Sequence, residues 1–449
     1  MSNFLTNNPV TRFIKDTVGP AAIMAAGMIG AGAVSTRLMA GCWFNYDLLW
    51  VALYVIPMVI IANDSASRIG NISGRGMMDM IKTELHPALA WFMLVPTFLL
   101  NIMVNMGQMS VMVAGTYGML GKQMPEGGAA TTGVIITTVV LTVITLLIVL
   151  FGGFKRLVKV MTGLLMLILF CFIIVAIKGL TQPGTWIGII KGLIPNIPDD
   201  VQVIGSDEVR GAFTQLMGIA GQALPASVFL SFGYFTSNAE FTADDVKATF
   251  RKNIINFGII WGLFSVVVVV AGATGLHAFY TDTTVVAGKI THYSQIDRVF
   301  DAGYVIAPAL PAALRNIAPP IFSLGLLVAG FTTLVSVAML MVYFCLDIVG
   351  KNWKYTADNT AFRWWLALWI AVPALISPFW QLPALIKNIL AMAGNLVLTP
   401  ISMLILLFFM NQTKYVKEHT ASITRNLIMV ITLLFALFVT VYKAIQMFG

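Results

Sequence analysis

Charged residues are scarce in this chain. They make up only 10% of its 449 residues, whereas a soluble globular protein carries about 25%. Hydrophobic residues account for 58%, and the mean hydropathy is +0.88. This balance excludes an ordinary soluble protein. It predicts an all-α polytopic membrane protein, because a chain that crosses lipid must satisfy its backbone polar groups internally.

Cysteine and histidine are also rare. The three cysteines, Cys42, Cys171 and Cys345, are scattered through apolar segments without paired spacing, so we expect neither disulfides nor a metal cage. No nucleophile–base set or metal-binding motif is visible, so we expect no enzyme activity and no cofactor. The net charge of +8 would suit nucleic acid, but the basic residues lie in short loops between apolar runs. Membrane topology explains them better, and no nucleic-acid partner is expected.

Long apolar segments fill most of the sequence. A helix needs about 20 apolar residues to cross a membrane, and we predict eleven spans. They are 18–43, 47–66, 88–119, 130–152, 156–178, 211–235, 253–278, 317–346, 363–379, 383–411 and 423–446. The first 19 residues are polar, so no cleavable signal peptide is expected. We expect a single transmembrane domain over residues 1–449.

Lysine and arginine are unevenly divided between the loops. With the N-terminus in the cytoplasm, the inner segments hold 17 of the 27 and the outer segments hold 9, while Arg37 lies inside the first span. This bias predicts a cytoplasmic N-terminus and, with an odd number of spans, an external C-terminus. We expect an integral protein of a bacterial inner membrane. In the outer loop that ends near residue 316, "APALPAALRNIAPP" predicts an interfacial helix.

Two spans contain residues that weaken a helix at its centre. The first span carries "GMIGAGAVSTR" (27–37), and the sixth carries "MGIAGQALPASVFLSFGY" (217–234), with Pro225 in its middle. Small residues also let membrane helices pack closely, which is the alternative explanation for either break alone. Breaks at matching places in two halves favour an inverted-repeat transporter with its site at the membrane midplane. The repeats would be 18–178 and 211–411, with an extra helix at 423–446.

Several motifs give the chain a family resemblance. "GPAAIMAAGMIGAGAVSTRLMAGCWFNYDLLW", "SASRIG" (65–70), "GGFKRLVKVMTGLL" (152–165) and "GQALPASVFL" resemble segments of the NRAMP divalent-metal transporters. The resemblance covers most of the chain and is strongest before residue 180. It implies the LeuT fold, with five plus five helices in inverted repeats and breaks in helices 1 and 6. It also implies eleven spans, as counted above.

The departures from the family pattern fall on its metal ligands. The family's Asp-Pro-Gly-Asn of the first helix is replaced by Gly30, Ala31, Gly32 and Ala33, and its Met-Pro-His of the sixth helix by Leu224, Pro225 and Ala226. The acidic pair of its third helix falls on Asn105 and Gln108. Divalent cations need oxygen, nitrogen or sulfur ligands, and hard ones favour carboxylates. We therefore hypothesise that the scaffold is retained while the cargo has changed.

Backbone groups at the two breaks are the predicted binding surface. A loop of small residues at a half-helix N-terminus offers free N–H groups and a positive dipole end, which suit an anion. The candidate substrate-binding residues are Gly30, Ala31, Gly32, Ala33, Ser35, Thr36, Gln222, Ala223, Leu224, Ala226, Ser227, Asn105 and Gln108. The hydroxyls have an alternative role, bonding to helix carbonyls four residues back. The amides, with Asn101 on the same stripe, have an alternative role as links between helices.

A coupling-ion site is predicted less directly. Relatives in the same fold superfamily bind sodium between the first helix and hydroxyls of the eighth, which implies a sodium site at Gly27, Thr332 and Thr333. Helix packing is the alternative role of these hydroxyls. The coupling ion is predicted to be Na⁺ or H⁺, and no metal-ligand set is predicted. Arg37 is expected to extend to the outer interface or to pair with an acid such as Asp47.

These patterns lead to two transport hypotheses, a main one and an alternative, and to a third hypothesis without transport. The main one is a secondary transporter that moves a small polar solute, such as an organic carboxylate or an amino-acid-like compound, by alternating access. The alternative is a divalent metal cation transporter for an ion like Mn²⁺ or Mg²⁺, with an altered site that binds a hydrated ion. The third is a non-transporting membrane receptor that kept the scaffold. The expected partners are this small molecule or ion and the lipid bilayer; the sequence sets no oligomeric state.

Overall fold

The computed structural model describes residues 24, 27–125, 129–151, 154–202, 208–238, 243–277, 298–356 and 359–448. This part of the chain is largely helical. Its long helices are α4 (Ala31–Phe44), α5 (Leu49–Ser73), α7 (Pro87–Met119), α8 (Thr132–Leu150), α9 (Phe154–Leu180), α11 (Ala212–Ala223), α12 (Ala226–Asn238), α14 (Gly262–Gly275), α17 (Ala318–Ile348), α18 (Thr360–Ile376), α19 (Ala384–Asn395), α20 (Thr399–Met410) and α22 (Ile423–Phe448).

The shorter elements connect these helices. They are α6 (Met77–Met80), η1 (Ile81–Leu85), α10 (Thr185–Gly192), β1 (Val201–Gln202), β2 (Val209–Arg210), η3 (Ala243–Asp245), α13 (Val246–Asn253), η4 (Ile254–Trp261), α16 (Val299–Ala302), η6 (Gly303–Ala309), η7 (Ala312–Ile317), η8 (Ser377–Phe379), η9 (Leu396–Leu398), α21 (Thr413–Val416) and η10 (Lys417–His419). The two strands form one antiparallel pair, with Val201 opposite Arg210.

The predicted polytopic class is confirmed. Within the described residues, nine helices are long and apolar enough to cross a membrane, or ten if the bent pair Leu169–Leu180 and Thr185–Gly192 is one span. The start of the first predicted span, at residues 18–23, lies outside the described residues. Its described helix, α4, has 14 residues, which is too short to cross a bilayer without the segment that precedes it.

Local sequence chemistry sets several helix ends. The His86 ring nitrogen Nδ1 accepts a hydrogen bond from the backbone N–H of Ala88 at 3.1 Å, and Pro87 occupies the first position of α7, where its missing N–H costs nothing. The Thr131 hydroxyl caps α8 in the same way, accepting from the N–H of Val134. At the other end of α5, Gly74 adopts a left-handed conformation, with φ of +66°, that closes the helix.

One sequence expectation about helix continuity is wrong. "APALPAALRNIAPP" forms the short 3₁₀ helices η6 and η7 instead of one interfacial helix, because Pro308 and Pro311 interrupt its hydrogen bonding. The tenth predicted span, 383–411, is confirmed as one apolar segment, Ala384–Met410, in which the 3₁₀ turn η9 lies between α19 and α20. Pro400, at the second position of α20, lacks the N–H that a continuous helix would use there.

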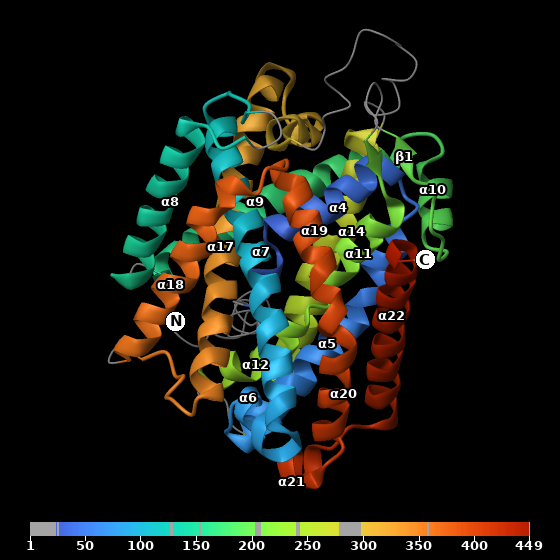
Figure 1. Ribbon diagram of the computed structural model, residues 1–449. Coiled ribbons are helices and arrows are strands. Elements are labelled where there is room, and N and C mark those ends of the chain that lie inside the picture. The colour runs from blue at the N-terminus through green and yellow to red at the C-terminus, as the bar shows by residue number, and fades with distance from the viewer. Residues whose placement is uncertain are drawn as a thin grey trace, which may run out of the picture.

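The helices that carry the two breaks lie in the interior. Every residue of α4 is buried, and α4 packs against α11, α14 and α19. The span of α11 and α12 is likewise entirely buried in its most apolar window. Figure 1 shows α8 and α22 on opposite flanks of the bundle, with α6 and α21 at one end and α10 and β1 at the other. The candidate site is therefore enclosed by protein rather than by lipid.

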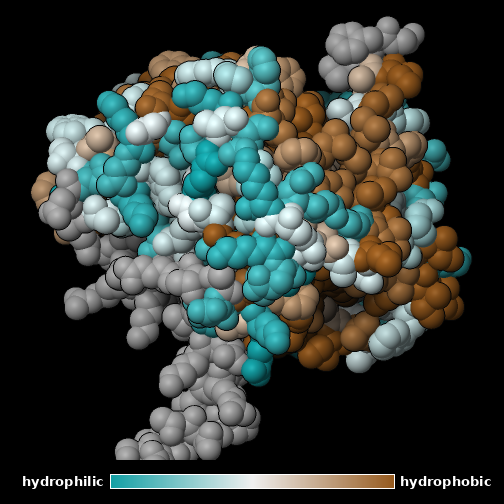
Figure 2. Space-filling model, turned by 90° about the horizontal axis from the view of Figure 1, so that it is seen from below, coloured by the Kyte–Doolittle hydropathy of each residue, from teal (hydrophilic) through white to brown (hydrophobic). Residues whose placement is uncertain are grey.

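The end that carries α6 and α21 has a different surface from the flanks. Seen from this end, hydrophilic side chains gather over the face, and hydrophobic side chains cover much of the flank beside it (Figure 2). This contrast is expected of a bundle whose sides contact lipid tails while its ends contact water. The predicted orientation, with this end in the cytoplasm, stays a prediction.

Candidate functional site

The first break lies at Ile29 and Gly30. The backbone bends there, and Gly30 is extended, with φ of −90° and ψ of −175°, directly before α4 begins. A side chain has no room at Gly30, because a Cβ atom would lie 1.6 Å from the Thr333 Oγ1 of α17. The glycine thus permits the close approach of α17.

The second break lies at Leu224 and Pro225, between α11 and α12. The carbonyl oxygen of Leu224 accepts a hydrogen bond at 2.5 Å from the hydroxyl of Thr399, which is the first residue of α20. The carbonyl of Pro225 accepts the first backbone bonds of α12, from Val228 and Phe229. Pro225 cannot donate a backbone bond, so the span separates into two helices at this point.

Gln222 joins the two breaks. Its Nε2 donates to the carbonyl oxygen of Met28 at 2.6 Å, on the chain that leads into the first break. Its Oε1 accepts from Nη1 of Arg37 at 2.6 Å. From its position two residues before the second break, a single amide side chain therefore binds both the backbone and a side chain of the first broken helix.

Arg37 does not reach the membrane interface, so that expectation is wrong. The residue has 0% of its surface exposed, because α4 is surrounded by other helices and its side chain has no path to water. The guanidinium bonds Gln222 and lies 5.0 Å from the ring centroid of Trp261, with no bond to Asp47. Its Nε and Nη2 have no hydrogen-bond partner among the described residues. A buried cation with free donors lies beside the breaks, where it disfavours other cations and favours anions.

A small cavity of about 50 Å³ opens between the breaks. A cavity of this volume can hold roughly three water molecules. Its lining includes Gly27, Met28, Gln222, Pro225 and Ser227 from the breaks, Asn101 from α7, Thr333 and Ser336 from α17, and Met392 and Asn395 from α19. These side chains supply uncharged oxygen and thioether groups. Within the described part of the chain, no group of three or more His, Cys, Asp or Glu residues is arranged to hold a metal ion.

Several predicted site residues lie near the cavity without lining it. Ala31, Gly32, Ala33, Ala223, Leu224 and Ala226 are buried in the helix ends that flank the breaks. The hydroxyl of Ser35 donates to the carbonyl of Ala31 at 2.7 Å, and that of Thr36 donates to Gly32 at 2.8 Å. Both hydroxyls have the helix-bonding role that was the alternative, so each would have to leave its carbonyl to contact a solute.

The amide stripe of α7 divides into two parts. Asn101 lines the cavity, while its Nδ2 donates to the carbonyl of Thr97 at 2.8 Å. Asn105 donates to the carbonyl of Trp369 at 3.4 Å, and Gln108 donates to Oδ1 of Asn388 at 2.7 Å. Asn105 and Gln108 therefore contact neighbouring helices rather than the cavity.

The predicted sodium residues also divide. The Thr333 hydroxyl donates to the carbonyl oxygen of Gly27 at 2.8 Å, which brings α17 and the first broken helix together as predicted. The Thr332 hydroxyl donates to Ala329 of its own helix at 3.0 Å. Sodium binding at this place stays a prediction.

The cavity contains residues that the sequence analysis missed. Met392 and Asn395 reach it because η9 interrupts the tenth span beside them, and the interruption was signalled only by Gly394 and Pro400. Met28 also lines it. The chain has 25 methionines, spread through its apolar segments, so no sequence pattern distinguishes Met28 from the others.

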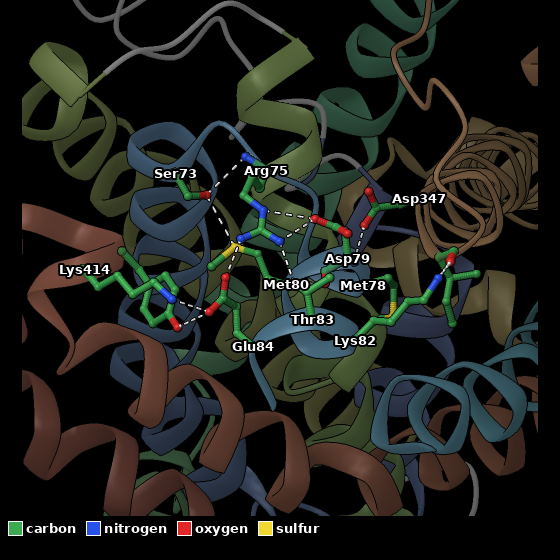
Figure 3. Close-up of polar contacts among 12 residues, drawn as sticks. Ser73, Arg75, Met78, Asp79, Met80, Lys82, Thr83, Glu84, Asp347 and Lys414 are labelled. Carbon is green, nitrogen blue, oxygen red and sulfur yellow. Dashed lines mark hydrogen bonds and ion pairs between the residues drawn. The ribbon is translucent and has the colours of Figure 1, made fainter. Parts of the chain in front are cut away.

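At the end of the bundle that carries α6 and α21, charged side chains tie the segments together (Figure 3). Nη1 of Arg75 lies 2.7 Å from Oε1 of Glu84, and Nζ of Lys414 lies 2.5 Å from Oε2 of the same carboxylate. Hydrogen bonds from Lys414 and then Arg75 lower the pKa of Glu84 to about 2. Asp347 of α17 accepts from the N–H of Asp79 at 2.8 Å. These contacts hold α6 and η1 against α17 and α21.

Several similar proteins from bacteria are named divalent metal cation transporter MntH. One from Aeromonas hydrophila is 26% identical over 123 residues, covering 27% of this chain and 30% of that protein. One from Klebsiella pneumoniae is 27% identical over 196 residues, covering 43% and 45%. One from Yersinia pestis is 22% identical over 331 residues, covering 74% and 72%. The alignments with the first two thus span less than half of each relative.

Solved structures of two transporters share the fold. A manganese transporter from Eremococcus coleocola superposes with a TM-score of 0.69 at 15% identity, covering 96% of this chain and 86% of that one. MhsT in complex with L-phenylalanine gives 0.57 at 13% identity, covering 92% and 98%. These likenesses confirm the predicted LeuT-like fold. A family model described as natural resistance-associated macrophage protein-like (Nramp) matches residues 21–446, so the resemblance is confirmed and the chain belongs to the Nramp family.

Proposed function

We propose that this Nramp protein is a secondary transporter whose cargo is a divalent metal cation, bound in the cavity between the two breaks and carried by alternating access. The names of the similar proteins support a metal cargo, which was the alternative of the two functions inferred from the sequence. Membership of a transporter family also supports transport rather than enzyme activity. The observation that supports the location is the cavity that both broken helices line.

Uncharged groups would have to hold the ion. The cavity offers the amide oxygens of Asn101 and Asn395, the hydroxyl of Ser227 and the thioether of Met28. Amide and hydroxyl oxygens suit hard cations, while a thioether suits softer ones. Without a carboxylate at the cavity, desolvation would be poorly compensated, so we propose that the ion keeps part of its water shell. We expect binding to be weaker and less selective than at a carboxylate site.

Alternating access would use the contacts that join the breaks. The half-helix before Gly30 is bonded to α17 through Gly27 and Thr333, and to α11 through Met28 and Gln222. Rocking of one broken helix against its neighbours must open these two bonds. Each is a single hydrogen bond, worth about 1 kcal/mol net, so the two can be exchanged for bonds to cargo or water during a cycle. Coupling to Na⁺ or H⁺ remains part of the proposal.

A small organic carboxylate or amino-acid-like compound is the second candidate cargo, and Arg37 favours it. Nε and Nη2 of Arg37 have no partner among the described residues, and Nη1 is separated from the cavity by Gln222, which lines it. A carboxylate that displaces the amide of Gln222 could accept two hydrogen bonds from the guanidinium. The same positive charge repels a metal ion, so Arg37 acts in opposite directions on the two candidates.

Replacing Arg37 distinguishes between the two candidate cargoes. We predict that Arg37→Gln strengthens Mn²⁺ binding by tenfold or more if the cargo is a metal, because a buried positive charge is removed while a hydrogen bond to Gln222 can be kept. Isothermal titration calorimetry with Mn²⁺ and Mg²⁺, together with a thermal-shift screen of small carboxylates and amino acids, measures both classes. Arg363→Gln, at an exposed arginine, is the matched control. A carboxylate that binds the wild type and is lost in Arg37→Gln would overturn the metal proposal.

A further inference from the structure

We propose that Lys387 of α19 is the proton-binding site that couples transport to a proton gradient; this inference rests on the transport function proposed above. In the structure the residue lies in the first turn of α19 and has 0% of its surface exposed. An ionisable side chain buried inside a transmembrane segment is a candidate for function, because burial of its charge is costly.

Two serines receive the Lys387 side chain. Nζ donates to the hydroxyl oxygen of Ser110 at 2.9 Å and to the carbonyl oxygen of Ser377 at 3.1 Å. The hydroxyls of Ser110 and Ser377 are 2.7 Å apart, and that of Ser377 donates to the carbonyl of Met106 at 2.7 Å. No carboxylate forms an ion pair with Lys387 in the part of the chain that the structure describes. A structural ammonium group would be expected to have such a partner.

The serine pair can serve both protonation states of the lysine. When the amine is charged, Nζ donates to the hydroxyl oxygen of Ser110 and to the carbonyl oxygen of Ser377. The Ser110 hydroxyl then donates to the Ser377 hydroxyl, which in turn donates to the carbonyl oxygen of Met106. When the proton leaves, the Ser110 hydroxyl can rotate and donate to the lone pair of the neutral amine, because a hydroxyl is both donor and acceptor. The proton thus binds and leaves Nζ without leaving a buried group wholly unpaired.

Few charged groups surround this site. The helices that pack against α19 are α4, α7 and α11, with η9 beside them, and η8 supplies Ser377. Their titratable side chains are Arg37 and Cys42 on α4 and Tyr117 on α7, and α11, η8 and η9 have none. Arg298 shares a pocket with Pro383 and Ala384 at the start of α19. Arg37 contacts Gln222 and Trp261 rather than Lys387. The N-terminal turn of α19 adds the positive end of a helix dipole, which further disfavours the ammonium form.

The position of Lys387 connects it to the cavity. The helix that carries it also carries Met392 and Asn395, which line the cavity one to two turns further along. Asn388, the next residue, donates to the carbonyl of Gly107 at 3.1 Å and accepts from Gln108 at 2.7 Å. These bonds fasten α19 to α7, which carries the lining residue Asn101. Gain or loss of a proton at Lys387 acts on the same helix pair that shapes the cavity.

The first test needs no cargo. The protein is labelled with ¹³C at the lysine Cε positions, and the Lys387 signal is identified by its loss in Lys387→Arg. We predict that the Lys387 signal changes over a pH range well below about 10.4, the pKa of free lysine, in which the signal of the free amino acid stays constant. If the Lys387 signal follows that of free lysine over this range, the inference is overturned, whatever the cargo proves to be.

The second test measures coupling in proteoliposomes. The ratio of Mn²⁺ uptake with an inward proton gradient to uptake without it is expected to be several-fold in the wild type and in Lys122→Gln. In Lys387→Gln and Lys387→Arg this uptake ratio should fall to about one.

Ser110→Ala removes an acceptor of the charged amine. This variant should shift the pH of half-maximal uptake down by about one unit. If Lys387 had only a structural role, replacing it would lower Mn²⁺ uptake equally with and without the proton gradient and leave their ratio unchanged. That result would contradict the proposal. If the Lys387 signal titrates but Mn²⁺ is not taken up, the proton site stands and the metal cargo fails.

Discussion

Single residues at the breaks determine how closely the helices approach. Gly30 has no side chain, and this absence allows Thr333 of α17 to donate its hydroxyl to the carbonyl of Gly27. The aspartate that the family carries at this place would not fit the present packing, since the first atom of any side chain would meet Thr333. A glycine at this position therefore determines the packing between the first broken helix and α17.

We predict that Gly30→Ala destabilises the protein by about 1–3 kcal/mol, the usual cost of overpacking. The added Cβ would lie 1.6 Å from Oγ1 and 2.8 Å from Cβ of Thr333. Thr333→Ala removes the nearer clash, so the double variant should be more stable than the sum of the single effects indicates. Thermal unfolding in detergent measures the three variants. Strict additivity would show that the two residues do not meet.

At the scale of elements, three interrupted spans converge on one cavity. Glycine and proline weaken the first and sixth spans, and both interruptions were predicted because they are local chemistry. The interruption at η9 was missed, since its residues 396–398 are apolar and resemble the interior of a helix. The amphipathic connection of α6 and η1 was also missed, because a π-helix has no recognisable sequence pattern.

The connection through Glu84 makes an element-scale prediction about pH. Because the folded-state pKa of Glu84 lies near 2, below its ordinary value, its stabilising contribution is complete above the ordinary value and is lost as the pH falls toward 2. We predict that the thermal unfolding midpoint of the wild type falls more steeply between about pH 4.5 and 2 than that of Glu84→Gln. Glu418→Gln, at a carboxylate 75% exposed in the neighbouring η10, is the control and should follow the wild type. Parallel curves for the wild type and Glu84→Gln would show that the carboxylate does not stabilise this connection.

At the scale of the whole molecule, composition predicted the class and motifs predicted the family. The burial of Arg37 and Lys387 could not be predicted, because it depends on which helices surround α4 and α19 rather than on either segment alone. The contacts of Asn105 and Gln108 were undecided for the same reason: helical spacing places them on one face but does not say which helix covers that face. The division into two five-helix repeats remains a prediction.

The central claim is that the cavity between the two breaks holds the cargo. Crystals grown with Mn²⁺ would test it through the anomalous scattering of manganese. We predict one peak in the cavity, within reach of Asn101 and Asn395 and with water among its ligands. Manganese bound elsewhere, with an empty cavity, would contradict the account.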